Sequence, residues 1–298
     1  MTRVALIGDG PRTAQLGAEF ALGGCSVAML GGEAERSAQL FEGSLRFAAA
    51  QGLAGPVELE RARALLDADG DGADDARLTL IVEALRGEAL EEKAAAIAPL
   101  AKAHPEALVA TTSQALGVTV LADAAGVAER AIAMRYGQPP MLVPVVELLA
   151  ARDTPHRLLD RVSQLLRAIG KRPVSLRRDV AGMIAGRLEV AIARECLWLL
   201  RRGVADAQEF DAILRDALAR GWTVAGPLAA AALGDAERLE RIAAAVIAEP
   251  QPPDGLEGLS EVAPAEPAEQ LRERRDEVLA AALRAERAAA HAAAGRAR

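Results

Sequence analysis

Short apolar runs alternate with stretches of helical pattern through roughly the first half of the chain. The runs are "VALIG" (4–8), "SVAML" (26–30), "LTLIVEA" (78–84), "ALVATT" (107–112), "AIAMRY" (131–136) and "VPVVELL" (143–149). Parallel strands need a crossover helix between them, and because helices then cover both faces, such strands are almost continuously apolar. The alternation therefore predicts an α/β fold, a Rossmann-like doubly wound parallel sheet.

The pattern changes after "RPVSL" (172–176) and becomes helical. From Asp179 onward apolar residues recur at helical spacing as far as Gly203, a glycine suited to ending a helix. A second helix is expected over 206–221, with Asp206 as its N-cap. A helical C-terminal domain therefore follows the sheet.

Three segments result from this division of the 298 residues. We expect a Rossmann-like dinucleotide-binding domain at 1–177 and a helical substrate and dimerisation domain at 178–247. Residues 248–298 begin as a proline-rich acidic linker and end in an Ala-, Arg- and Glu-rich stretch. A long exposed helix and a loosely held tail are both compatible with that composition.

Composition and charge argue against several classes of function. The net charge of −7 and an aromatic content of 2% give neither an electrostatic nor a stacking surface for nucleic acid. No apolar run approaches the roughly 18 residues of a membrane span, and no charged leader precedes the first strand. Cys25 and Cys196 lie far apart in apolar runs, as in a reduced protein. We expect a cytoplasmic protein without a membrane partner.

The first strand leads into "GDGPRTAQLG", a glycine-rich turn before a helix. Gly8 permits the tight turn, and Gly10 lets the backbone approach a pyrophosphate at the positive end of the helix. The third glycine of the dinucleotide-binding motif is replaced by Thr13, which pushes the helix and the strand apart or demands local adjustment. Asp9 adds a negative charge near the phosphates, which Arg12 is placed to offset.

Gly31 and Gly32 stand where an acidic residue would bind the adenine ribose. Glu33 could reach the ribose by a detour, whereas Arg36 could meet a 2′-phosphate. A third interpretation is a turn that no longer binds a dinucleotide well. The expected cofactor is therefore NAD or NADP, bound through a weakened motif.

A small set of separated segments, in order and with nearly constant spacing, resembles the 3-hydroxyacyl-CoA dehydrogenase family over about residues 1–245. The segments are "VALIGDGPRTAQLGAEFALGG", "GSLRFAAAQG", "LIVEALRGEALEEK", "VATTSQALGVTVLA", "AMRYGQPPMLVPVVELL", "AIGKRPVSLRRDVAGMIAGRL" and "RRGVADAQEFDAILRDALARGWTVAGP". The resemblance implies an NAD-binding domain, a dimerising helical domain, and hydride transfer between a hydroxyacyl thioester and nicotinamide in fatty acid metabolism.

The resemblance also marks what has changed in the catalytic stretch. In the family a histidine in a His-Phe-Phe-Asn-Pro stretch takes the hydroxyl proton and is held by a glutamate twelve residues later. Here the histidine position is Arg135, and the glutamate is kept as Glu147. Gln138, also in this stretch, could orient a carbonyl by hydrogen bonding.

Three further positions of the family pattern lie outside that stretch. The substrate-contacting serine falls on Gln114, and an asparagine at the start of the helical domain falls on Gly186. Glu83, in the segment that the family passes beneath the nicotinamide, is kept.

Arg135 is the change with the largest chemical consequence. Alcohol oxidation by hydride transfer leaves a proton, and a guanidinium has no lone pair to accept it. Arg135 could instead bind a substrate carboxylate or phosphate, or form an ion pair with Glu147 that fills the vacated site. By sequence, His104, His156 and His291 do not replace the histidine, and we expect Tyr136 to pack in the core.

No metal site is expected. Asp67, Asp69, Asp71 and Gly72 begin like a calcium loop, but the twelfth position is Leu78 where a bidentate glutamate is required. The segment is interpreted as an acidic surface turn.

Two hypotheses of different class follow. The first is a divergent NAD(P)-linked oxidoreductase with a changed hydroxyacyl or hydroxy-acid substrate and weak or absent ordinary dehydrogenase activity. The second is a catalytically silent homologue that binds an acyl-CoA or nucleotide, or acts as an assembly partner. Both retain a homodimer through the helical domain.

Overall fold

A computed structural model describes residues 2–68, 78–233, 236–248, 250–253, 255–262 and 266–296. The chain forms two compact units. The first comprises residues 1–183 with 273–298, and the second comprises residues 184–272. Most of the acidic turn considered as a calcium loop, at 69–77, lies outside the described residues.

The first unit is built on an eight-stranded sheet with strand order β3-β2-β1-β4-β5-β6-β7-β8. Its strands are β1 (Arg3–Ile7), β2 (Ser26–Leu30), β3 (Leu66–Asp67), β4 (Leu80–Glu83), β5 (Leu108–Thr111), β6 (Ala131–Tyr136), β7 (Val145–Ala150) and β8 (Arg172–Ser175). The Rossmann-like doubly wound sheet is confirmed. The order reverses at β1, which pairs in parallel with both β2 and β4. Such a reversal opens a crevice at the carboxyl ends of the strands.

One strand pair departs from the parallel arrangement that the sequence predicts. β7 runs antiparallel to β6, and the short connection between them leaves no room for a crossover helix. This reversal sets the register of the candidate site, because Arg135 then lies directly opposite Glu147.

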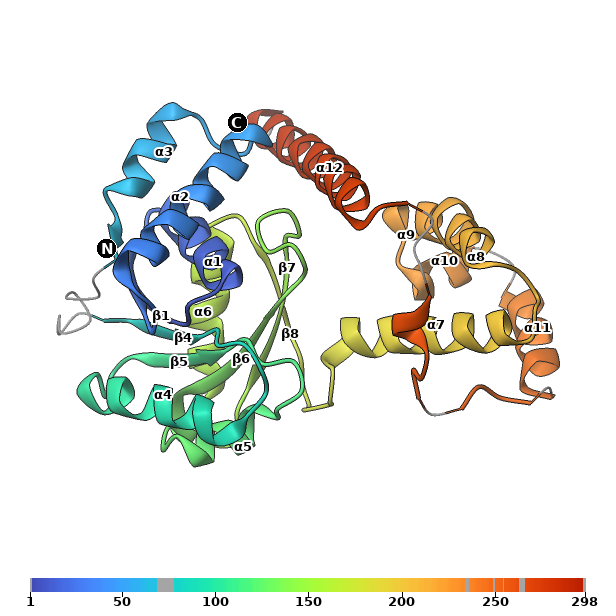
Figure 1. Cartoon of the computed structure of the whole chain (residues 1–298), viewed down its shortest axis with the longest axis horizontal. Helices are drawn as coiled ribbons and strands as arrows, with labels where there is room; N and C mark the ends of the chain where they lie inside the picture. Colours follow the sequence, from blue (N-terminus) through green and yellow to red (C-terminus); the bar gives the residue numbers. More distant parts are fainter. Residues whose placement is uncertain are drawn as a thin grey trace. The chain divides into compact units, whose positions relative to one another are not determined.

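Helices cover both faces of the sheet (Figure 1). One face packs against α1 (Pro11–Leu22), α2 (Ala34–Ala50), α3 (Pro56–Arg63) and α6 (His156–Ala168). The other face packs against α4 (Leu90–Ala103) and α5 (Val118–Ala124). Successive strand residues alternate between the two cores: Val4 and Leu6 of β1 face α1, whereas Ala5 and Ile7 face α4 and α5.

The second unit is helical throughout its regular structure. It contains most of α7 (Met183–Arg201), then α8 (Ala207–Ile213), a π-helical turn (Leu214–Ala219), α9 (Arg220–Val224), α10 (Pro227–Leu233) and α11 (Ala236–Ala248), and a short 3₁₀ turn (Leu259–Glu261). The predicted caps are confirmed. The Asp206 side chain accepts a hydrogen bond from Glu209 N at 2.9 Å, and Gly203 adopts φ +67° just beyond α7.

The tail forms α12 (Ala268–Arg296). Its last part belongs to the first unit, where Ala280 and Leu283 are buried. Arg284 donates to the carbonyl of Gln51, and Glu286 forms an ion pair with Arg172 at 2.5 Å. The composition allowed a long exposed helix or a loosely held tail, and the structure shows the helix. Its last part is packed within the first unit and is not wholly exposed.

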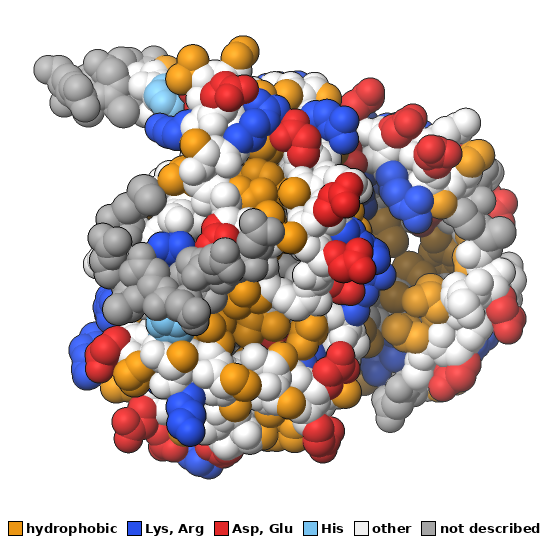
Figure 2. Space-filling view, turned by 60° about the vertical axis from the view of Figure 1, so that its left-hand side comes forward, with side chains coloured by type: hydrophobic (Ala, Val, Ile, Leu, Met, Phe, Trp, Pro, Cys, Tyr) orange, Lys and Arg blue, Asp and Glu red, His pale blue; other side chains and the backbone are white. Residues whose placement is uncertain are grey.

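The surface carries mixed charge. Figure 2 shows acidic and basic side chains interspersed over one face of the molecule, among uncharged and hydrophobic ones. Of the described helices, none is long and apolar enough to cross a membrane.

A buried ion pair ties α1 to the beginning of β8. Lys171 pairs with Glu19 of α1, and its Nζ also donates to the carbonyls of Pro140 and Val143, at 2.5 and 3.2 Å. The same ammonium lies 5.7 Å from the centre of the Tyr136 ring. Tyr136 therefore belongs to the core on the α1 face, where burial raises the pKa of its hydroxyl.

Glu19 should make the stability of the protein depend on pH. Burial raises the pKa of Glu19 from 4.5 to about 7, although Lys171 opposes the shift. The folded state therefore holds this proton more tightly than the unfolded state, and stability from this group falls as pH rises from 4.5 through about 7. We expect Glu19→Gln to reduce the loss in unfolding free energy between pH 5 and pH 8 by about 3 kcal/mol.

Urea unfolding at several pH values measures this effect. Glu92→Gln, at an exposed position of α4, is the matched control and should leave the pH dependence unchanged. Identical profiles for the wild type and Glu19→Gln would show that Glu19 does not bind its proton more tightly in the folded state.

Candidate functional site

The turn between β1 and α1 lies at the crevice of the sheet. Gly8 adopts φ +150°, and a Cβ there would come 2.5 Å from the hydroxyl of Thr13 and 2.9 Å from the carbonyl oxygen of Ala84. Thr13 is fully buried, and its hydroxyl donates to Ala84 O at 3.4 Å. The threonine at the third glycine position is thus accommodated because residue 8 has no side chain.

The amino terminus of α1 fits the pyrophosphate of a dinucleotide. No side chain caps its first turn, and Pro11 occupies the first helical position, so the free N–H groups of that turn are available to an anion. Gly10 precedes the helix, and the Arg86 guanidinium lies over it, with Nε 2.9 Å from the place a Cβ would take. Arg12, at the second helical position, is half-buried.

The end of β2 does not fit recognition of the ribose by a carboxylate. Gly31 adopts φ +93°, and a Cβ there would lie 3.4 Å from the backbone nitrogen of Gly8. A Cβ on Gly32 would lie 3.1 Å from Cβ of Asp9. The two turns therefore pack backbone to backbone, and the nearby Glu33 and Arg36 are exposed.

Arg135 connects three elements at the carboxyl end of β6. Its Nη2 donates to Oε1 of Gln114, in the loop after β5, at 3.1 Å. Its Nη1 donates to the carbonyl oxygen of Gly182, just before α7. Glu147, directly opposite on β7, is 6% exposed. The structure therefore brings Arg135, Gln114 and Glu147 to one face of the sheet.

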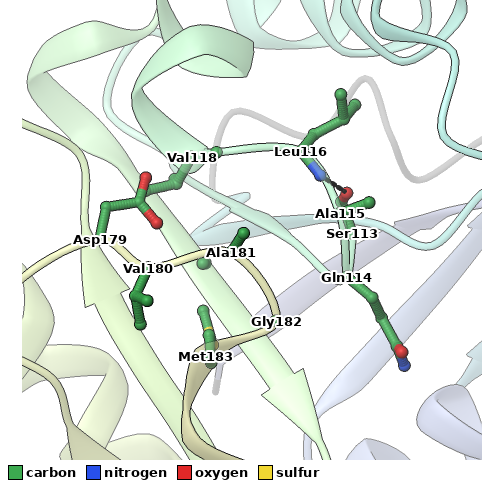
Figure 3. Close-up of a pocket in the computed structure, with 12 residues that line it drawn as sticks. Ser113, Gln114, Ala115, Leu116, Val118, Asp179, Val180, Ala181, Gly182 and Met183 are labelled. Atoms are coloured by element: carbon green, nitrogen blue, oxygen red, sulfur yellow. Dashed lines mark hydrogen bonds between the residues drawn. The ribbon is translucent and has the colours of Figure 1, made fainter. Parts of the chain in front are cut away.

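A cavity of about 150 Å³ lies beside this group (Figure 3). The loop 113–118, Ala133 of β6 and the segment 179–183 line it. The carboxylate of Asp179 points toward Val118 in Figure 3, and its Oδ2 is 3.0 Å from the place a Cβ of Gly117 would take. The cavity is thus lined by a loop after β5 and by the strand-to-helix segment that Arg135 holds.

Glu88 is a further residue of the site that sequence reasoning missed. Its carboxylate accepts hydrogen bonds from the Ser113 hydroxyl and, at 3.0 Å, from the backbone nitrogen of Gln114. Ser113 in turn accepts from Leu116 N at 3.1 Å, the dashed line in Figure 3. Glu88 therefore positions the loop that carries Gln114. No sequence pattern distinguishes it from neighbouring surface glutamates.

Glu83 is fully buried at the end of β4. One oxygen accepts from Lys93 Nζ at 2.7 Å and from Leu85 N at 2.8 Å, and the other accepts from the Thr111 hydroxyl at 2.6 Å. Lys93 is 2% exposed. These bonds hold the ends of β4 and β5 and the start of α4 together, which is a positioning role beneath the crevice.

The structure does not gather every residue proposed from the sequence. Gln138 is exposed in the connection after β6 and does not line the cavity. Tyr136 faces the α1 side of the sheet, away from Arg135. The described residues contain no cluster of His, Cys, Asp and Glu suited to a metal ion.

Comparison with known proteins agrees with this geometry. The family model of the NAD-binding domain of 3-hydroxyacyl-CoA dehydrogenase matches residues 3–180, more than half of the chain. The chain belongs to this family. Its first unit is an NAD-binding domain of that kind, and the fit to the pyrophosphate described above is consistent with it.

The individual relatives cover the chain to different extents. A 3-hydroxyacyl-CoA dehydrogenase from Gibberella moniliformis is 30% identical over 168 residues, which are 53% of this chain and 52% of that protein. A 5-formyl-3-hydroxy-2-methylpyridine 4-carboxylate 5-dehydrogenase from Mesorhizobium japonicum is 29% identical over 42% of this chain and 40% of its own length. The chain thus spans about half, or less, of the curated relatives it matches.

The fold is matched over a longer stretch. The crystal structure of a 5-formyl-3-hydroxy-2-methylpyridine 4-carboxylic acid 5-dehydrogenase, described as an NAD+-dependent dismutase, superposes with a TM-score of 0.79 at 23% identity. The match covers 95% of this chain and 98% of that one. The likeness shows that the helical region as well as the sheet follows the fold of these dehydrogenases.

Removing one partner of the buried ion pair between Glu83 and Lys93 should destabilise the protein. Lys93→Met leaves the charge of Glu83 buried and unpaired, and we expect it to lower the unfolding free energy by roughly 3 to 5 kcal/mol. The double variant Glu83→Gln with Lys93→Met removes both charges and should be more stable than Lys93→Met alone. Urea unfolding measures both, and equal stability of the single and double variants would contradict the pairing.

Proposed function

We propose that the protein is a divergent NAD(P)-linked oxidoreductase whose small-molecule substrate carries a carboxylate or similar anion near the reacting carbon. The observation that carries this proposal is the position of Arg135 beside the cavity. Its contacts with Gln114 and Gly182 use two of its five N–H donors within the described part of the chain. A guanidinium with donors to spare binds planar anions bidentately.

The chemistry of the site agrees with an altered substrate. NAD or NADP would supply the hydride acceptor, and the proton of the oxidised hydroxyl must leave separately. Arg135 cannot accept it, and Tyr136 faces the opposite side of the sheet. We therefore propose that the proton passes to water, which makes the oxidation of a plain hydroxyacyl thioester slow.

One relative and one solved structure support a carboxylated substrate as a class. The Mesorhizobium japonicum relative is named for a pyridine carboxylate, and the solved structure of a dehydrogenase for the same compound shares the fold. A free carboxylate next to the reacting centre gives Arg135 a binding partner in place of the proton transfer it cannot perform.

A second candidate function rests on the same side chain. Arg135 already bonds to Gln114 and Gly182, so the position vacated by the histidine is filled. A catalytically silent homologue would need only a filled site of this kind. Such a protein would bind an acyl-CoA or nucleotide, or assemble with an active relative. Measured binding and turnover distinguish the two candidates.

We propose a homodimer through the helical unit. That unit exposes many large apolar side chains, among them Val224 and Leu228, each 88% exposed, and Ile247, 73% exposed. A surface of this kind is typical of a protein interface.

Dinucleotide and substrate binding test the oxidoreductase proposal. By calorimetry we expect NADH or NADPH to bind, and in their presence 3-hydroxybutyrate to bind more tightly than 3-hydroxybutyramide, which lacks the charge. Arg135→Gln should reduce that preference about tenfold, because a charge-assisted bond is lost. If no dinucleotide binds, the oxidoreductase proposal is wrong. If a dinucleotide binds but no hydroxy acid is turned over, the silent homologue is favoured.

Arg135→His should not restore ordinary dehydrogenase activity. The restored imidazole would lack the family's substrate contacts, because Gln114 and Gly186 stand at those positions. Turnover of 3-hydroxybutyryl-CoA, followed by NADH absorbance, measures this. A rate typical of enzymes, about 10 s⁻¹ or more, would show that these two positions matter less than we propose.

Light scattering after gel filtration tests the dimer. We expect a mass twice the 31.1 kDa of the chain, and a lower mass for Leu228→Asp, which places a charge on the apolar surface. Val57→Asp, at an exposed position of the sheet unit, is the control. A monomeric wild-type protein would contradict the proposal.

A further inference from the structure

We infer that Arg86 binds the pyrophosphate of the dinucleotide, and that this chain recognises its cofactor through the phosphates rather than through the adenine ribose. The inference rests on the proposed function for the cofactor class and adds the residue and the specificity. Its consequence is that NAD(H) and NADP(H) bind with similar affinity.

The topology brings Arg86 to the phosphate turn. Arg86 follows β4, which pairs in parallel with β1, so the loops after the two strands leave the same edge of the sheet. Its Nε, Nη2 and Cζ lie 2.9, 3.3 and 3.5 Å from the place a Cβ of Gly10 would take. Any side chain at position 10 would displace the guanidinium. Gly10 thus makes room for a cation as well as for a ligand.

Positive charge gathers at the phosphate turn, beside the exposed carboxylate of Asp9. The amino terminus of α1 carries about half a positive charge from the helix dipole. Arg86 adds a full positive charge beside it and makes no hydrogen bond or ion pair with the described residues. An anion bound at this turn would interact favourably with both positive groups. A pyrophosphate would accept from both, and the planar fork of arginine matches phosphate oxygens.

The residues expected to contact the adenine ribose also favour recognition of the cofactor through its phosphates. In dinucleotide-binding folds, an acidic residue after the second strand selects NAD by bonding the 2′-hydroxyl, and it repels a 2′-phosphate. Here Gly31 and Gly32 occupy that place, packed against Gly8 and Asp9. Neither glycine attracts a free hydroxyl or repels a 2′-phosphate, and the exposed Glu33 and Arg36 nearby carry opposite charges. Affinity must then come from the phosphates, which NAD and NADP share.

Calorimetry with NADH, NADPH and inorganic pyrophosphate tests the inference on three proteins. These are the wild type, Arg86→Ala, and Arg157→Ala as the matched control. Arg157 is an exposed arginine near the start of α6, which follows the end of β7 at the opposite edge of the sheet. Because Arg86 is exposed, its replacement should not affect folding, which circular dichroism checks.

We expect NADH and NADPH to bind the wild type within about threefold of each other. Arg86→Ala should weaken both, and pyrophosphate as well, by about tenfold to a hundredfold, the range for a hydrogen bond to a charged group. It should also reduce the salt dependence of binding. Arg157→Ala should change none of these.

The outcomes separate this inference from the proposed function. If NADH binds the wild type and Arg86→Ala equally, the oxidoreductase proposal stands and the role of Arg86 is overturned. A preference of more than about tenfold for one dinucleotide in the wild type overturns phosphate-based recognition. Binding of pyrophosphate that depends on Arg86, without binding of any dinucleotide, supports the anion site and refutes the proposed function. If the wild type binds neither NADH, NADPH nor pyrophosphate, both the role of Arg86 and the proposed function are wrong.

Discussion

The parallel pairing of β1 with β2 on one side and β4 on the other is the interaction on which the rest of the structure depends. It aligns the carboxyl ends of three strands, so that Gly8 lies close to Ala84 on one side and to Gly31 on the other. Close backbone approach at this point leaves no room for side chains at Gly8. The phosphate turn, the missing ribose carboxylate and the position of Arg86 all follow from how these three strand ends meet.

Thr13 illustrates how the chain tolerates a departure from the usual glycine pattern. A third glycine normally permits close packing of helix on strand. Here the threonine hydroxyl occupies the space above Gly8 and donates to the carbonyl of Ala84, so the polar atom is satisfied although it is buried. The turn therefore keeps its geometry, and the change does not by itself argue against dinucleotide binding.

The sequence predicted the elements whose signal is local. Buried parallel strands are uninterrupted apolar runs, and the Asp206 cap and the Gly203 terminus are set by a few adjacent residues. The antiparallel β7, the two-residue β3 and the packing of α12 depend on pairing partners distant in the chain, for which a single sequence holds no pattern. Glu88 and Arg86 were missed for the same reason, since each is an ordinary charged residue until the fold brings Ser113 or Gly10 beside it.

Three residues of the site together concentrate positive charge in it. Arg135 places a permanent charge at the end of β6, Gln114 accepts a hydrogen bond from it, and Arg86 places a second cation at the phosphate turn. Each of the two arginines adds a group that can hold an anion. Because Arg135 also bonds to the carbonyl of Gly182, the charge is built into the segment that begins α7. A substrate anion bound by the remaining N–H donors of Arg135 would thus bond to a side chain that is already held by the loop after β5 and by residues 179–183.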